Sequence, residues 1–104
     1  MVAKNSKYRV ANAKIAILVP AHNEEEVIDR SLARAVEEAG RENVYLVADA
    51  CTDRTVRFAS YRIGSEHVHE VERSGKGPAL MKTIRHFGLL ERYDGVFMAD
   101  ATVF

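Results

Sequence analysis

The sequence predicts an α/β protein built on a doubly wound, mostly parallel sheet. Three short apolar runs and one alternating run of strand character are separated by three stretches with helical periodicity. Short runs without a polar residue are typical of strands that are buried on both faces, as in a parallel sheet. Right-handed crossovers place the connecting helices on both faces, which gives the order βαβαβαβ.

The first strand is expected at residues 15–19 and the first helix at residues 24–39. The strand should stop at Pro20, because proline cannot donate a hydrogen bond to a strand ladder. Asn23 is expected to cap the helix, and the glutamates at positions 24 to 26 suit the positive end of its dipole. A polar, acidic turn is therefore predicted at the carboxyl end of the first strand.

The second strand is expected at residues 44–48, with a polar turn at residues 49–53 leading into the second helix. Thr52 or Asp53 can cap this helix. Residues 68–71 are expected to form a weaker strand near an edge of the sheet, with His67 and His69 on one exposed face.

The third helix is expected after the turn at residues 73–78, because Pro78 suits the first turn of a helix. Its apolar stripe comprises Leu80, Ile84, Phe87 and Leu90. The fourth strand, at residues 95–99, leads into Asp100.

The ends of these strands predict where a ligand binds. If the first and fourth strands are neighbours, residues 22–24, Asp49 and Asp100 rise at one edge of the sheet. In open α/β sheets ligands bind at the carboxyl ends of the strands, where the strand order reverses.

Length and composition indicate one small domain, expected at residues 14–104 after a flexible basic arm at residues 1–13. Lys+Arg 15 balance Asp+Glu 15, which argues against a nucleic-acid partner. Cys51 is the single cysteine, so no internal disulfide can form, and we expect a reducing, cytoplasmic location. No apolar run approaches the length of a membrane span.

Several common sites are disfavoured. Gly77, not Ser or Thr, follows Lys76, so the turn is not a P-loop, and glutamates in the first turn would repel the pyrophosphate of a dinucleotide. No pair among the histidines and Cys51 has the spacing of a structural zinc site. Cys51 with His22 could form a nucleophile and base, although a buried small hydrophobe is the commoner role of such a cysteine.

The remaining chemistry fits a nucleotide. Asp49 could accept a hydrogen bond from a base N–H, and Glu24 or Asp100 from ribose hydroxyls. Arg73 and Lys76 could neutralise a diphosphate, with the flanking glycines allowing close approach of the backbone. Each of these residues has a structural alternative: Asp49 could belong only to a helix cap, and Lys76 could be only a solvated surface residue.

Four segments in order, residues 15–25, 47–53, 73–80 and 93–100, resemble the nucleotide-sugar-binding, N-terminal half of glycosyltransferase family 2. They correspond to the Pro-Ala-x-Asn-Glu-Glu turn, a second-strand Ala-Asp motif, a Gly-Lys-Gly turn and the strand leading to an Asp-x-Asp motif. The resemblance implies the Rossmann-like half of a GT-A fold.

The resemblance also implies a nucleotide-sugar donor, with a UDP-sugar as the first expectation. The residues that it assigns to the donor, together with those inferred from the turns, are Pro20, Ala21, Asn23, Glu24, Asp49, Arg73, Lys76 and Asp100. Asp100 matches the first aspartate of Asp-x-Asp, which implies a role with the ribose and with a divalent metal, Mn²⁺ or Mg²⁺.

Two departures from the family pattern shape the expected function. Thr102 stands where the second aspartate is expected, and a hydroxyl is a poor replacement for a carboxylate on a hard cation. The family's acceptor-binding half and catalytic base lie downstream of Phe104. We therefore expect the donor-binding portion of an inverting glycosyltransferase, with no turnover by these 104 residues alone.

Two alternatives and one assembly remain open. The first alternative is a non-catalytic nucleotide-binding or assembly module with the same fold, which Thr102 favours. A flavodoxin-like regulatory domain is a weaker option. We also expect the fourth strand to present an unpaired apolar edge over residues 96–104, through which a two-fold homodimer could form.

Overall fold

A computed structural model describes residues 2–3, 13–73 and 76–101, the side chains of residues 2, 3 and 76 excepted. It confirms the alternation of strands and helices. In chain order the elements are β1 (Val2–Ala3), β2 (Ile15–Ala21), α1 (Ile28–Ala39), the 3₁₀ turn η1 (Arg41–Asn43), β3 (Val44–Asp49), α2 (Thr55–Ile63), the 3₁₀ turn η2 (Ser65–His67), β4 (Val68–Val71), α3 (Lys76–Phe87), α4 (Leu89–Arg92) and β5 (Gly95–Met98).

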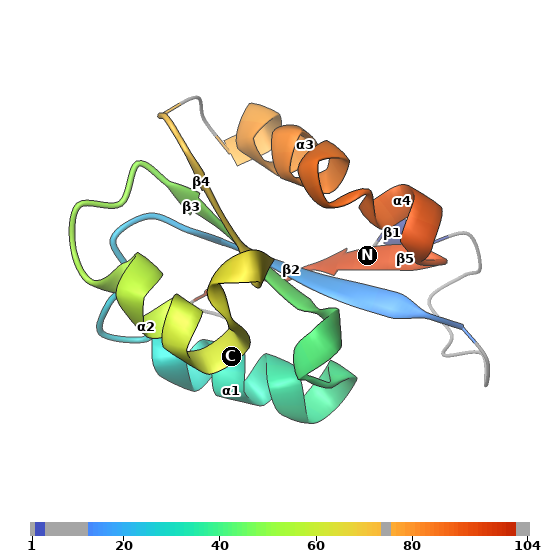
Figure 1. Cartoon of the computed structure of the whole chain (residues 1–104), viewed down its shortest axis with the longest axis horizontal. Coiled ribbons are helices and arrows are strands. Elements are labelled where there is room, and N and C mark those ends of the chain that lie inside the picture. The colour runs from blue at the N-terminus through green and yellow to red at the C-terminus, as the bar shows by residue number, and fades with distance from the viewer. Residues whose placement is uncertain (1, 4–12, 74–75, 102–104) are drawn as a thin grey trace.

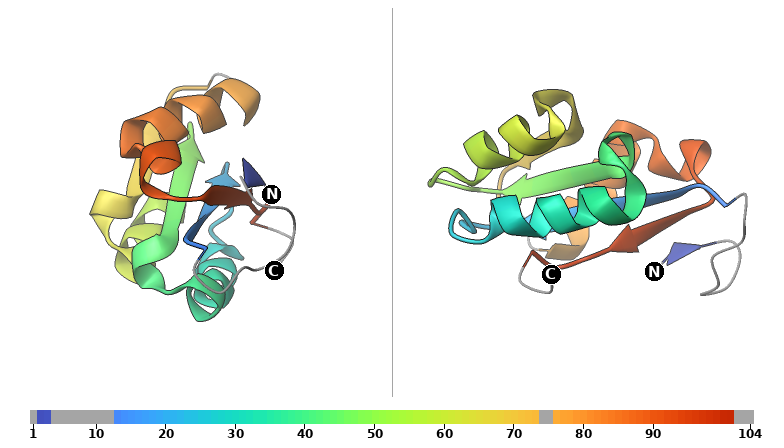
Figure 2. Two further views of the ribbon diagram at one scale, coloured as in Figure 1. Left: turned by 90° about the vertical axis from the view of Figure 1, so that its right-hand side faces the viewer. Right: turned by 90° about the horizontal axis from the view of Figure 1, so that it is seen from below.

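The sheet has the strand order β1-β5-β2-β3-β4. The four strands from β5 to β4 are parallel, and β1 is antiparallel to β5. The first and fourth predicted strands, β2 and β5, are therefore neighbours, as the predicted ligand edge requires. Helices α1 and α2 cover one face of the sheet and α3 and α4 cover the other (Figures 1 and 2).

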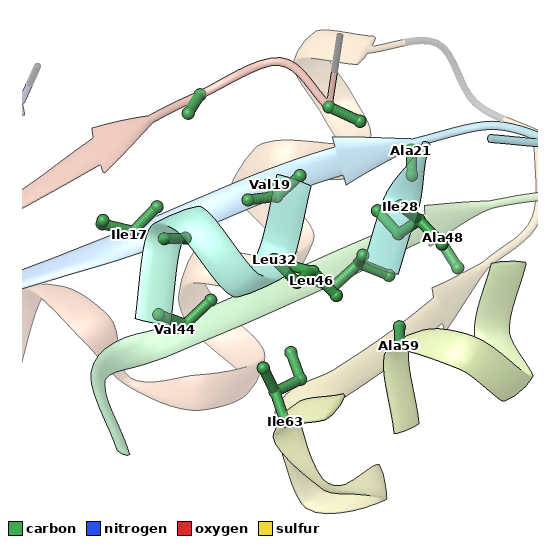
Figure 3. Packing of buried hydrophobic residues seen from close by; sticks show 13 residues of the cluster. Ile17, Val19, Ala21, Ile28, Leu32, Val44, Leu46, Ala48, Ala59 and Ile63 are labelled. Atoms are coloured by element: carbon green, nitrogen blue, oxygen red, sulfur yellow. The ribbon is translucent and has the colours of Figure 1, made fainter. Parts of the chain in front are cut away.

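Each face of the sheet has its own apolar core. On the α1 and α2 side, Ile28 and Leu32 of α1 pack with Val19 and Leu46 from the two central strands (Figure 3). On the α3 and α4 side, buried residues of the same strands pack with both helices, and the cluster comprises Ala16, Leu18, Tyr45, Val47, Ala79, Ile84, Leu89, Tyr93 and Val96. Strands β2 and β3 are thus buried on both faces, as their unbroken apolar runs predict.

The expected stop at Pro20 is wrong, because β2 continues through Pro20 to Ala21. Pro20 pairs with Val47 of β3, whereas pairing with β5 ends at Leu18. The carbonyl of Leu18 accepts a hydrogen bond on the β5 side, and backbone groups two residues apart point the same way. The nitrogen of Pro20 therefore points toward the β5 side, where the strand pairing has already ended, so no ladder hydrogen bond is lost.

Helix α1 begins at Ile28, later than expected. A turn precedes it, in which the carbonyl of Glu24 accepts from the N–H groups of Val27 and Ile28, at 3.0 Å and 2.8 Å. No side chain caps α1, so the predicted capping role of Asn23 is wrong for its own helix. The glutamates lie in this turn rather than in the helix.

The predicted stripe on the third helix also needs one correction. Gly88, with a left-handed φ of 63°, separates α3 from the short helix α4. This break turns Leu89 into the core, while the side chain of Leu90 is 47% exposed. The prediction assumed one uninterrupted helix, and in such a helix Leu90 would lie on the same buried face as Phe87.

Strand β4 lies at the edge of the sheet, as predicted, but its histidines are not on an exposed face. His67 and His69 are both half-buried. The ring of His67 stacks on Tyr45 at 4.3 Å, and that of His69 stacks on His86 of α3 at 4.0 Å between centroids. The two histidines thus belong to the layer between the sheet and α3.

The predicted free edge of β5, residues 96–104, is wrong at Val96. There β5 pairs with β1, so Val2 and Ala3 are part of the sheet and not of a flexible arm. Beyond this pairing the side chains of Phe97 and Met98 are 40% and 37% exposed. Residues 102–104 lie outside the described part of the chain, and the homodimer stays a prediction.

Candidate functional site

An open cavity of about 290 Å³ lies where the carboxyl ends of β2 and β3 meet the start of α3. This volume is at the lower end of the range for small-molecule sites. Its lining residues come from the ends of three parallel strands and from α3, and they are Pro20, Ala21, His22, Glu24, Val47, Asp49, Ala79 and Asp100. Pro20, Ala21, Glu24, Asp49 and Asp100 are all among the residues expected from the sequence.

Asp49 gives this cavity an unused hydrogen-bond acceptor. Its Oδ1 atom is buried and has no hydrogen-bond partner among the described residues. The backbone carbonyl of Asp49 accepts from Nδ1 of His22 at 2.5 Å. Because a carbonyl can only accept, the hydrogen of this bond lies on Nδ1 of His22. Val47 and Ala79 provide apolar surface beside these groups.

The turn after β2 and the turn after β3 are joined by hydrogen bonds around Asn23. Its Oδ1 accepts from the N–H groups of Thr52 and Asp53, at 2.8 Å and 3.2 Å. Its own N–H donates to Sγ of Cys51 at 3.4 Å, and that thiol donates to the carbonyl of Ala21 at 3.5 Å. The two loops beside the cavity are thus one hydrogen-bonded unit.

Asp53 extends this unit toward α2. Its Oδ1 accepts from the N–H of Thr55 at 2.9 Å, and its Oδ2 accepts from the N–H of Glu25 at 3.2 Å. Burial acts to raise the pKa of Asp53, but the hydrogen bonds from Thr55 and Glu25 outweigh it, and the pKa is lowered. Asp53 therefore stays a carboxylate that holds the first residue of α2, although the N-cap position of this helix is Arg54, which makes no side-chain hydrogen bond there.

Cys51 has surroundings that suit a structural residue. The thiol is half-buried, and this burial raises its pKa. A raised pKa disfavours the thiolate that a nucleophile needs. His22, the base suggested for it, makes its hydrogen bond to the carbonyl of Asp49 instead.

A family model that covers most of the sequence identifies the family of the chain. The family model described as Glycosyl transferase family 2 matches residues 16–88, which is 73 of the 104 residues. The chain belongs to glycosyltransferase family 2. The matched region runs from β2 to the end of α3 and contains every cavity-lining residue except Asp100.

Solved structures share the fold. Glucosyl-3-phosphoglycerate synthase from Mycobacterium tuberculosis, in complex with Mn²⁺, uridine-diphosphate and phosphoglyceric acid, is 24% identical, with a TM-score of 0.56 over 88% of this chain and 34% of that chain. The same enzyme with uridine-diphosphate is 22% identical, with a TM-score of 0.57 over 90% of this chain and 35% of the other. A mycobacterial protein is 21% identical, with a TM-score of 0.59 over 88% and 32%. The predicted Rossmann-like, GT-A fold is confirmed.

The chain spans about a third of the length of these solved proteins. A search of curated proteins finds no match. Within the described residues, no helix combines the length and the apolar character that crossing a membrane requires.

Two of the expected site residues, Asn23 and Arg73, do not line the cavity. Asn23 faces the neighbouring turn, and Arg73 is exposed just after β4. The side chain of Lys76 lies outside the described part, although its backbone begins α3. Asp100 does line the cavity, and the buried hydroxyl of Ser31 donates to the carbonyl of the next residue, Ala101, which fixes the chain there.

The cavity also contains residues that the sequence did not single out for the donor. His22, Val47 and Ala79 line it. His22 occupies the variable position of the Pro-Ala-x-Asn-Glu-Glu turn, and its place beside two expected residues was the available signal. Val47 and Ala79 look like ordinary core residues, so only the packing of α3 on the sheet reveals their position.

A divalent metal is implied by the family, and the described residues do not form a site for it on their own. Within residues 13–73 and 76–101, no group of three or more His, Cys, Asp or Glu side chains is placed to hold a metal ion. Asp100 offers one carboxylate at the cavity, and Thr102 lies outside the described part. A hard cation needs several oxygen ligands, which the described residues do not bring together at the cavity.

Proposed function

We propose that the cavity binds the nucleoside of a nucleotide-diphospho-sugar, with a UDP-sugar as the first candidate. The observation that carries this proposal is the buried Oδ1 of Asp49, an acceptor without a partner among the described residues. Uracil offers one ring donor, N3–H, and burying an acceptor is favourable only when such a donor meets it. Membership of glycosyltransferase family 2 and the uridine-diphosphate in solved structures of the same fold support the choice.

The rest of the donor extends from Asp49 along the same edge of the sheet. Glu24 and Asp100 line the cavity and can accept from ribose hydroxyls. The amino-terminal end of α3 is beside the cavity, because Ala79 lines it, and the free N–H groups of a helix start favour a phosphate. Apart from its chain neighbours and its own helix backbone, no atom of the described residues lies within 4 Å of a Cβ added at Gly77, so the backbone is open to a ligand on that side. Arg73, exposed just after β4, is the proposed counter-charge for the diphosphate, and Lys76 stays a predicted one.

Titration with chosen nucleotides tests the base assignment. Calorimetry is run with UDP and with UDP methylated at N3, which keeps the ring, ribose and diphosphate but lacks the donor. We expect UDP to bind and the methylated compound to bind at least about tenfold more weakly, the scale of losing one buried hydrogen bond and adding a clash. Equal affinity for the two compounds would show that Asp49 does not read N3–H.

The diphosphate assignment has a separate test in Gly77→Ala. Alanine suits the interior of a helix better than glycine, so the fold is retained. Its methyl group would stand in the open space beside the proposed phosphates. We expect weaker binding of UDP with unchanged binding of uridine, and an equal effect on both ligands would contradict this placement.

We further propose that the chain serves sugar transfer with inversion. An acceptor hydroxyl attacks the anomeric carbon, the new C–O bond forms as the bond to the diphosphate oxygen breaks, and the nucleoside diphosphate leaves with that electron pair. The acceptor proton passes to a base outside the described residues. Inversion is checked by the anomeric configuration of the product in ¹H NMR.

The alternative, a nucleotide-binding module without chemistry, is favoured by Asp100 being a single carboxylate with Thr102 at the next acidic position. UDP-glucose carrying ¹³C in the sugar separates the two. A new anomeric signal would support the transferase. Binding without transfer would support the module only when the acceptor-binding half and the base of the family are also supplied, because these 104 residues alone are not expected to turn over. Under this reading Mn²⁺ should bind weakly, and Thr102→Asp should strengthen it.

A further inference from the structure

Asn23 uses one side-chain oxygen to hold a turn that comes about 30 residues later. The Oδ1 atom accepts from the N–H of Thr52 at 2.8 Å and from that of Asp53 at 3.2 Å, and the Thr52 hydroxyl lies 3.5 Å away. Both N–H groups belong to the turn that follows Asp49. Three donors from the turn after β3 therefore point at the Oδ1 atom of Asn23.

The backbone of Asn23 is shaped for this role. Its φ of 50° is left-handed, a region that asparagine tolerates better than most residues. In this conformation its N–H reaches Sγ of Cys51, at 3.4 Å. Side chain and backbone thus both contact the turn after β3.

Asn23 itself does not line the cavity. Its neighbours His22 and Glu24 do, and so does Asp49, whose chain leaves the sheet into the turn that Asn23 holds. Ala50 also has a left-handed φ of 50°, so the turn bends sharply one residue after the carboxylate. The direction of that bend depends on what holds its far end.

We propose that Asn23 is a positioning residue, whose side-chain oxygen fixes the turn after β3 so that Asp49 presents Oδ1 to the cavity. Asn23 makes no contact with the nucleotide. The part of this inference that concerns the nucleotide rests on the proposed function, whereas the hold on the turn does not.

Two substitutions separate positioning from direct binding. A carboxylate oxygen can accept the same N–H groups, so Asn23→Asp keeps the hold on the turn. It removes every donor of the side chain and adds a negative charge, which would damage direct binding to a nucleotide diphosphate. Asn23→Gly keeps the left-handed backbone and removes the oxygen.

The first measurement is amide hydrogen exchange of Thr52 and Asp53 in wild type, Asn23→Asp and Asn23→Gly without nucleotide. We expect protection in the wild type and the Asp variant, and about tenfold faster exchange in the Gly variant. The second is the affinity for UDP, expected to fall about tenfold in the Gly variant and to stay within about threefold in the Asp variant.

Several results would overturn the proposal. One is unprotected amides of Thr52 and Asp53 in the wild type, a measurement that needs no variant to fold. Another is loss of UDP affinity in the Asp variant while both amides stay protected, which would indicate direct contact. If wild-type protein does not bind UDP, the proposed function fails, and the exchange of the Gly variant alone supports or overturns the hold on the turn.

Discussion

Replacing Asp49 by alanine should stabilise the free protein and weaken nucleotide binding at the same time. In the free protein the buried Oδ1 of Asp49 has no hydrogen-bond partner among the described residues. The neighbouring bonds of this segment, from His22 Nδ1 and from the N–H of Ala50 to Val71, use backbone atoms and survive the substitution. The change therefore removes an unpaired acceptor and leaves these backbone hydrogen bonds of the described residues in place.

The two effects have different sizes. A buried acceptor without a partner costs about 1–3 kcal/mol. Asp49 as a whole is only half-buried, so we expect the free energy of unfolding to rise by about 1 kcal/mol, the lower end of that range. With UDP, the lost hydrogen bond of about 1–3 kcal/mol corresponds to about 5- to 140-fold weaker binding.

Urea unfolding with and without UDP measures both effects in one experiment. A ligand at about 100 times its dissociation constant adds about 2.7 kcal/mol to the stability of the wild type. If the affinity for UDP falls more than about sixfold, the order of stability should reverse: Asp49→Ala is the more stable protein alone and the less stable one with UDP. Asp49→Asn, which keeps the shape and one acceptor, is the control and should retain part of the binding. A destabilised Ala variant, or one that binds UDP like the wild type, would refute the reasoning.

Three further predictions concern the layer around α3 and α4. Burial and the nearby charge of His86 lower the pKa of His69, so below about 6.5 the unfolded chain binds more protons than the folded one. The free energy of unfolding should therefore fall as the pH drops from about 7.5 to about 5. In His69→Gln the urea midpoint should fall less over this pH range, and an equal fall in both proteins would contradict the prediction. Tyr93→Phe should cost about 1–3 kcal/mol in urea unfolding, because the Tyr45 hydroxyl, 2.9 Å away, loses its partner in the core, and an unaltered midpoint would argue against this bond. Gly88→Ala should cost about 1 kcal/mol in thermal unfolding through its left-handed φ alone, since the nearest atom to an added Cβ is 4.0 Å away, and Gly88→Asn should cost less.

Much of the fold could be predicted because apolar periodicity reports burial directly. The unbroken run of β2 and the stripe of α1 fixed both the element types and their order. The ligand edge followed from one further assumption, that β2 and β5 are neighbours, which the sheet confirms.

The failures came where a local rule depends on what lies beside the residue. Proline ends a strand only where a neighbouring strand would accept a hydrogen bond from its N–H. The nitrogen of Pro20 points toward the β5 side, where the pairing has already ended at Leu18. Asn23 looked like a cap for the helix that follows it, but its oxygen is used by a turn about 30 positions away. Neither neighbour can be seen from the local sequence.

The site was predictable in its acceptors and not in its walls. Glu24, Asp49 and Asp100 are acidic residues that follow predicted strands, so they could be assigned to the site from the sequence. Val47 and Ala79 contribute only surface, and their role depends on how α3 lies against the sheet. Charged groups can be assigned to a site before the fold is known, whereas apolar lining cannot.

The bonds around Asn23 also bear on the order in which the chain folds. They join residues 28 to 31 positions apart, whereas the bond from the N–H of Lys14 to Asp94 beside β5 spans 80 positions. Closing the longer loop costs about 0.9 kcal/mol more in chain entropy. As a nascent chain leaves the ribosome, β2, α1, β3 and α2 can therefore pair before β5 is made. The turn that holds Asp49 could then form before Asp100 is synthesised, and Asp100 would complete the lining of the cavity last.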